Sequence, residues 1–259
     1  MSGAAVKPIE KRMLSLLEND PLLKPFAGLI HRRLTRLENT QKRLTGGKIS
    51  LADFASGHEF FGLHFRNDVW IFREWAPNAE AVYLIGDMTD WTEKKAFALE
   101  KTGADGVWEI RLPSEKLEHR NLYRLRIHWP DGMGERIPAY ARRVVQDPDT
   151  LIFNAQVWLP PEPYRWKNSH SYHTSEPPLI YETHVGMAQD EEKIGSFREF
   201  TLVILPRIVA AGYNTLQLMA VMEHPFYGSF GYQVANFFAS SSRFGTPEDL
   251  KALVDTAHG

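Results

Sequence analysis

A segment near the end of the chain combines residue types that suit a carbohydrate site. Residues 223–238 hold six aromatic residues together with glycines and a proline. Flat rings stack on the faces of pyranose rings, and small residues let the backbone approach a ligand closely. Two of the aromatic residues, Phe237 and Phe238, are predicted to belong to the core instead. The composition therefore predicts a sugar-contacting loop that follows an apolar run and precedes a capped helix.

Other motifs point away from metal, nucleotide and thiol chemistry. His170 and His173 have no third partner nearby, so we predict no metal site. The turn from Gly103 to Gly106 is a hairpin and not a phosphate loop, because no lysine or helix start follows it. The chain has no cysteine, and its net charge of -2 without a basic stripe argues against nucleic-acid binding. No cofactor is implied.

The elements that must position the loop begin with a helical segment. Residues 8–45 carry apolar side chains at helical spacing, such as Ile30, Leu34 and Leu37, and Gly46 ends the pattern. The first thirty residues hold no uninterrupted apolar stretch, so we expect neither a signal peptide nor a membrane span. A cytoplasmic protein with an N-terminal helical segment over 1–56 is the expectation.

The sequence then changes to a period of two. Residues 69–75, 108–112 and 123–128 alternate apolar and polar side chains and are separated by turn clusters. This pattern is typical of an all-β, immunoglobulin-like sandwich, which we place over 57–160. Trp108 shares its face with other apolar residues and is predicted to point into the core. Residues 160–178 hold five prolines, so we interpret 161–178 as a domain linker.

The last part alternates strands and helices. We expect strands over 179–185 and 215–221 and a helix over 197–211, with the second strand buried on both faces because it is nearly all apolar. Thr246 is placed as the N-cap of a final helix. The order β-α-β-loop-α over 179–259 is the opening of either an α/β barrel or a doubly wound sheet.

Three stretches carry a resemblance to a known family. Residues 73–91 resemble the family-forty-eight starch-binding module, and residues 137–149 resemble the exit of that module. Residues 181–186 and 205–258 are similar to the first two units of the family-thirteen barrel of α-glucan branching enzymes. The resemblance implies a multidomain chain, made of a helical segment, a sandwich and a truncated TIM (β/α)8 barrel.

The resemblance also implies contacts with an α-1,4-glucan. It implies that Tyr232 stacks on the glucose at the cleavage subsite, with Gln233 and Tyr227 as weaker candidates beside it. It further implies that Trp75 and Pro77 line a surface groove for a malto-oligosaccharide. Four further residues are expected near that groove: Gly47, Lys48, Gly106 and Val107. From the residues alone, Trp75 could equally anchor the sandwich core, with Pro77 only turning the chain.

The implied reaction cuts an α-1,4 bond and transfers the chain to a 6-hydroxyl group. Transfer with retention needs two carboxyl groups about 5 to 5.5 Å apart, and the family takes them from later barrel strands. We therefore name no catalytic residue and interpret Glu223 as a structural group. Glu182 and His184 are predicted to be buried polar groups satisfied by their neighbours.

The chain as given is expected to be inactive, with residues 179–259 unstable alone, because a typical barrel takes about 250 residues. Two alternatives stay open: a non-catalytic α-glucan-binding protein and a debranching relative.

Overall fold

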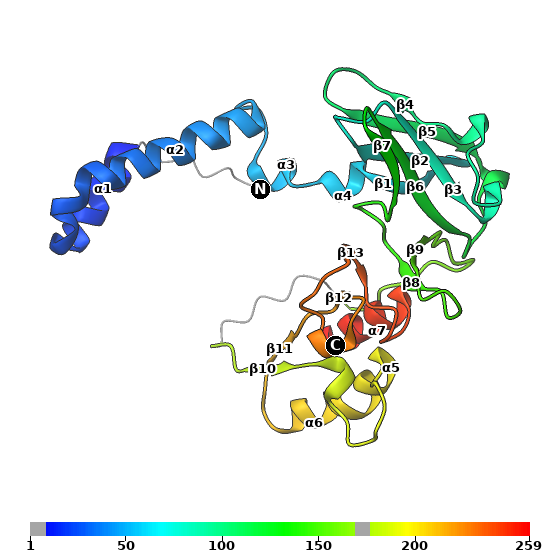
Figure 1. Ribbon diagram of the computed structural model, residues 1–259. Helices are drawn as coiled ribbons and strands as arrows, with labels where there is room; N and C mark the ends of the chain where they lie inside the picture. Colours follow the sequence, from blue (N-terminus) through cyan, green and yellow to red (C-terminus); the bar gives the residue numbers. More distant parts are fainter. Residues whose placement is uncertain (1–8, 169–176) are drawn as a thin grey trace. The chain divides into compact units, whose positions relative to one another are not determined.

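The computed structural model describes residues 9–168 and 177–259 (Figure 1). Two compact units divide the chain, one ending at Gly57 and the other beginning at His58. Within the described residues, no helix has both the length and the apolar character needed to cross a membrane.

The first unit is helical. It contains α1 (Ile9–Asn19), α2 (Ala27–Thr45) and α3 (Leu51–Phe54), with a 3-10 turn over Pro21–Phe26 between the first two. Asp20 begins that turn by accepting a hydrogen bond from the Leu22 backbone N–H at 3.0 Å. Helix α2 ends at Gly46, whose φ of 59° lies in the left-handed region that favours glycine.

The short helix α4 (Gly57–Phe60) begins at the last residue of the first unit, and two antiparallel sheets follow it in the second. The first sheet has the order β1 (Gly62–Arg66), β2 (Val69–Trp75), β5 (Val107–Pro113), β4 (Glu100–Lys101). The second has the order β3 (Ala81–Gly86), β6 (Leu122–Trp129), β9 (Phe153–Gln156), β8 (Val144–Gln146), and β7 (Gly132–Arg136) also pairs with β6.

One core joins the two sheets, as the period-two pattern predicts. Phe72 lies opposite Ile110 in the first sheet, Leu84 lies opposite Leu125 in the second, and all four side chains are buried in one cluster. Trp108 is 6% exposed and belongs to this cluster, which confirms its predicted core position.

The end of the chain adds a parallel pair of strands joined by a helical connection. Strands β10 (Ile180–Thr183) and β11 (Thr215–Leu218) are parallel, and α5 (Phe197–Glu199), a π-helical turn over Phe200–Ile204 and α6 (Leu205–Ala210) lie between them in sequence. The π turn ends two residues before Pro206, which has no N–H to continue a regular α-helical ladder. The antiparallel pair β12 (Met222–Glu223) and β13 (Asn236–Ser240) and the helix α7 (Pro247–His258) follow.

Two burial predictions for this part are wrong. The run 215–221 was expected to be buried on both faces, but the residues of β11 are half-buried or exposed. Within the described residues β11 pairs with β10 alone, so no further strand covers its other edge. Glu182 is exposed and accepts a hydrogen bond from the Gln217 side-chain amide at 2.9 Å, because these two residues lie opposite each other in the parallel pair.

Polar contacts connect this part to the sandwich inside the second unit. The Arg143 guanidinium donates to the Gly245 carbonyl oxygen at 2.6 Å, and the Trp158 indole donates to the Glu248 carboxylate at 2.7 Å. The first described residues of the predicted linker are bonded to α7, since the Tyr164 hydroxyl donates to the Asp255 carboxylate at 2.7 Å. The rest of the linker, with His170 and His173, lies outside the described residues, and the domain boundaries stay a prediction.

Candidate functional site

A cavity of ≈ 610 Å³ lies in the sandwich between two walls. The lining residues from the end of β2 and the turn after it are called the first wall, and those from β6, from the end of β7 and from the segment after β7 are called the second wall. We call this cavity the tryptophan groove. The lining residues that matter here are Glu74, Trp75, Pro77, Trp129, Arg136 and Ala139.

The first wall presents Trp75 to solvent. Its side chain is 59% exposed, and its indole N–H donates to the Asp105 carbonyl oxygen at 2.9 Å, which fixes the ring. A Cβ at Gly106 would lie 2.5 Å from Cα of Pro77, so only glycine permits the close packing of this turn on Pro77. Val107 lies opposite Trp75 in the β2–β5 pair. The structure thus brings four of the predicted residues together and excludes Trp75 as an anchor of the core.

A buried carboxylate lies directly beneath this wall. Glu74 is 6% exposed, and its two carboxylate oxygens accept hydrogen bonds from the backbone N–H groups of Trp75 at 3.1 Å and Ala139 at 3.0 Å. Burial raises the pKa of Glu74, and these two hydrogen bonds partly oppose the rise. The sequence analysis did not select Glu74. The pattern that could have indicated its burial is the alternation of β2, which places this acid on the same inward face as Phe72.

The aromatic loop, residues 224–235, displays two predicted residues. Tyr232 is 66% exposed and Gln233 is exposed, and the backbone N–H of Tyr232 donates to the Ser229 carbonyl oxygen at 3.0 Å. The preceding Gly231 has a φ of 87°, and a Cβ there would overlap the Ala220 carbonyl oxygen. Glycine is therefore required for the turn that presents Tyr232.

Tyr227 packs inward instead. Its half-buried ring stacks on His224 with centroids 6.4 Å apart and meets the edge of His184 at 6.1 Å. A Cβ at Gly186 would lie 2.7 Å from the Tyr227 hydroxyl oxygen. Burial raises the pKa of this tyrosine. The environment favours a packing role, and glucan contact by Tyr227 stays a prediction.

Glu223 connects the start of the aromatic loop to the segment that follows β13. The side chain is fully buried, and its carboxylate accepts hydrogen bonds from the backbone N–H groups of His224 at 3.0 Å and Ser242 at 2.6 Å. The structural interpretation of Glu223 is thus confirmed.

His184 is buried as predicted, but the expectation that neighbours satisfy it is wrong. Neither ring nitrogen has a hydrogen bond of good geometry within the described part of the chain. The ring is instead surrounded by aromatic edges, including those of Phe230 and Phe244. Burial lowers the pKa of His184, and the nearby Phe230 backbone only partly offsets this effect.

The core prediction for two phenylalanines is also wrong. Phe237 is 72% exposed and Phe238 is 46% exposed, and the Phe238 ring stacks on Tyr140 at 4.4 Å. Asn236 and Ala239 take the buried positions of β13. The Asn236 side chain fills the interior position because it hydrogen-bonds the backbone of Pro138, after β7, and the backbone of Phe238, in β13 itself.

Comparison with known proteins identifies the relatives of the chain. Residues 60–148 match the model of carbohydrate-binding module 48, the isoamylase N-terminal domain. A 1,4-alpha-glucan-branching enzyme of Rhizophagus irregularis is 43% identical over 247 residues, which are 93% of this chain and 36% of that enzyme. The corresponding enzyme of Dictyostelium discoideum is 39% identical over 249 residues, covering 94% of this chain and 36% of that enzyme. The chain is homologous to the 1,4-alpha-glucan-branching enzymes.

These comparisons confirm the resemblance to branching enzymes, and they also show that the chain spans 36% of the length of these two curated relatives. Solved structures support the fold alone. A mutant pullulanase from Paenibacillus barengoltzii, complexed with maltotetraose, matches with a TM-score of 0.62 at 20% identity, covering 84% of this chain and 39% of the pullulanase.

Two residues expected near the groove of this branching-enzyme homologue lie in the helical unit. Gly47 and Lys48 are exposed in the turn after α2, where Gly47 has a φ of 68° and the Lys48 N–H donates to the Thr45 carbonyl oxygen at 3.1 Å. They belong to the other compact unit, so their contact with the groove stays a prediction.

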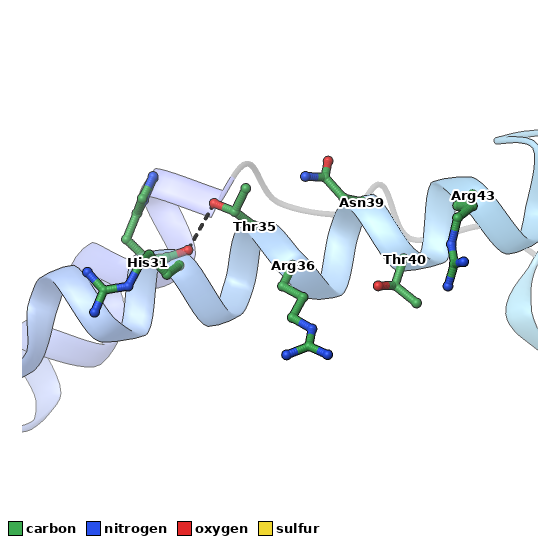
Figure 2. Close-up of a pocket in the computed structure, with 7 residues that line it drawn as sticks. His31, Thr35, Arg36, Asn39, Thr40 and Arg43 are labelled. Carbon is green, nitrogen blue, oxygen red and sulfur yellow. Dashed lines mark hydrogen bonds between the residues drawn. The ribbon is translucent and has the colours of Figure 1, made fainter.

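A hollow of ≈ 570 Å³ on α2 does not make a second candidate site in the branching-enzyme homologue. Its lining comes from this one helix. The polar contact drawn in Figure 2, from the Thr35 hydroxyl to the His31 carbonyl oxygen at 2.9 Å, is a bond within the helix. Arg36 and Arg43 extend away from Thr35 and Asn39, so the side chains do not converge on a ligand (Figure 2).

Metal ligands do not gather among the described residues either: no group of three or more His, Cys, Asp or Glu side chains is placed to hold an ion there.

Proposed function

We propose that this chain binds α-1,4-glucan and that the whole protein uses this grip to make α-1,6 branches. Cutting an α-1,4 bond and passing the chain to a 6-hydroxyl group would be its reaction. Support comes from relatives of about 40% identity named 1,4-alpha-glucan-branching enzymes. The observation that carries the proposal is the exposed, hydrogen-bonded Trp75 beside Pro77, inside the segment that matches a carbohydrate-binding module.

We infer a finer architecture for the second unit. Its two sheets would form an immunoglobulin-like sandwich, and β10, the helical connection and β11 would form the first unit of a (β/α)8 barrel. The parallel pairing of β10 with β11 supports this assignment, as does the TM-score of 0.62 with the pullulanase. Barrel enzymes bind substrate at the carboxyl ends of their strands. The aromatic loop follows β11 in the chain, which supports a substrate role for Tyr232 and Gln233.

Physical chemistry explains why such surfaces suit a glucan. The C–H faces of glucose pack on an indole ring, and a ring already fixed by its N–H loses little conformational freedom on binding. Transfer must also compete with hydrolysis, so the acceptor chain has to be held close and water kept from the reacting carbon. A glucan held at Trp75 and near Tyr232 would meet the first of these requirements.

Calorimetric titration of the 259-residue chain with maltoheptaose tests the binding. Trp75→Ala should weaken affinity by about 5- to 30-fold, because removing the ring contact costs about 1–2 kcal/mol. Trp166→Ala is the matched control, since Trp166 is also an exposed tryptophan, at 43%, and does not line the groove. Equal affinities for the parent chain and Trp75→Ala would contradict the proposal.

The transfer step is tested on the full-length protein. Incubation with amylose should shift the iodine stain and create α-1,6 linkages. Loss of existing branches from glycogen would instead identify a debranching enzyme, and glucan binding without either product would leave a binding protein.

A further inference from the structure

The second wall of the tryptophan groove contains another aromatic surface. Trp129 ends β6 and is half-buried, and its ring lies against the glycines of β7. A Cβ at Gly134 would lie 3.1 Å from the ring carbon Cη2, and one at Gly132 would lie 3.5 Å from the indole nitrogen. These two glycines leave the space in which the indole ring packs on the hairpin. The ring is therefore held in place before any ligand arrives.

The Arg136 guanidinium lies beside this ring and forms no salt bridge with a described residue. The Arg136 guanidinium carbon is 5.8 Å from the centroid of a Trp129 ring, and Arg136 lines the groove as an exposed residue. The neighbouring arginines of β6 are engaged, because Arg124 and Arg126 both form salt bridges with Glu135. No carboxylate of the described residues forms a salt bridge with Arg136. Its N–H donors remain available to a ligand.

The groups that line the groove indicate what kind of ligand it suits. The indole rings of Trp75 and Trp129 offer apolar surfaces of the kind on which the C–H faces of a sugar pack. The Arg136 guanidinium carries N–H donors that can reach hydroxyl oxygens of the same ligand. A ligand rich in hydroxyl groups, with apolar faces, fits this combination.

We propose that the tryptophan groove grips an α-glucan from both walls. Trp129 supplies a second apolar surface opposite Trp75, and the Arg136 guanidinium donates hydrogen bonds to sugar hydroxyl groups. A volume of ≈ 610 Å³ is within the range of small-ligand sites and leaves room for contacts on two sides. The inference rests on the proposed function, and it adds Trp129 and Arg136 as binding residues of the same groove.

Calorimetric titration of the 259-residue chain with maltoheptaose tests the second wall. Arg136→Gln should weaken affinity by about 5- to 10-fold, as expected for losing hydrogen bonds from a charged donor. Trp129→Leu, which keeps an apolar group against the core, should weaken it to a similar extent. Arg111→Gln is the matched control. Arg111 pairs with Glu109 outside the groove, and its loss should leave affinity unchanged.

The outcomes separate this inference from the proposed function. Weaker binding by both Trp75→Ala and Arg136→Gln, with Arg111→Gln unchanged, supports a two-sided grip. If Trp75→Ala weakens binding while Arg136→Gln and Trp129→Leu bind like the parent, the second wall is overturned and the proposed function stands. Parent-like affinity in all of these variants overturns both. Thermal melts identify any variant that fails to fold, and the exposed Arg136 gives a decisive variant if Trp129→Leu unfolds.

Discussion

Replacing Asn236 with alanine should loosen the junction between the aromatic loop and the sandwich. This side chain is 4% exposed, and its amide nitrogen donates to the carbonyl oxygens of Pro138 at 3.0 Å and Ala139 at 3.3 Å. Its amide oxygen accepts from the backbone N–H groups of Phe238 at 2.8 Å and Ala239 at 3.0 Å. One side chain therefore satisfies four backbone groups at the end of the loop and at the exit of the sandwich.

The expected magnitude follows from these four bonds. A net contribution of about 1 kcal/mol per hydrogen bond predicts a loss of about 3–4 kcal/mol of unfolding free energy for Asn236→Ala. Asn121→Ala calibrates the estimate inside the same unit. The Asn121 side chain accepts one hydrogen bond, from the Glu118 backbone N–H at 2.7 Å, so this variant should lose only about 1 kcal/mol.

Urea unfolding of the 259-residue chain, followed by tryptophan fluorescence, measures both variants against the parent. Asn236→Asp adds a second test, because it keeps the two acceptor contacts but faces the carbonyl oxygens with a carboxylate. That repulsion should raise the pKa of the introduced acid, so the variant should regain stability as the pH falls. Equal losses for Asn236→Ala and Asn121→Ala would refute the reasoning that this amide holds the junction.

Three other substitutions and one fragment each examine a different part of the structure. Gly106→Ala should weaken maltoheptaose binding by about tenfold, since its Cβ would displace Pro77, whereas an unchanged dissociation constant would show that Pro77 makes no contact. Glu223→Gln should cost about 1–3 kcal/mol in urea unfolding, because an amide N–H would face a backbone donor in place of a carboxylate oxygen. In the unfolded chain His184 takes up a proton as the pH falls through about 6.5, whereas burial lowers its pKa in the fold. Its contribution to the free energy of unfolding should therefore be complete above that pH and be lost as the pH falls further. His184→Phe should reduce this pH dependence, and an unchanged dependence would contradict the reasoning. Residues 179–259 expressed alone should be insoluble or unfolded, and a cooperative melt of that fragment would refute the expectation.

Local patterns in the sequence were enough to predict the type of several elements. The alternation of β2, β5 and β6 followed from one buried face, and Gly46 ended α2 because glycine adopts the left-handed conformation readily. The composition of residues 223–238 predicted an aromatic loop, whereas the structural interpretation of Glu223 and the glucan contact expected of Tyr232 came from the resemblance to branching enzymes. The local patterns depend on neighbours a few residues apart, and such neighbours are visible in a sequence.

Burial and long-range pairing were decided only by the tertiary structure. Phe238 is aromatic in a core-like pattern, yet it lies outside the core because Asn236 occupies the interior of β13 and joins Pro138, which is nearly a hundred positions earlier. Glu74 and Arg136 likewise become parts of one groove only when the fold brings the ends of β2 and β7 together. Which face of a strand is covered, and which distant side chains share a cavity, depends on how whole sheets pack. The sequence alone determined several elements and the aromatic, glycine-rich character of the loop. The packing determined which distant side chains share a cavity.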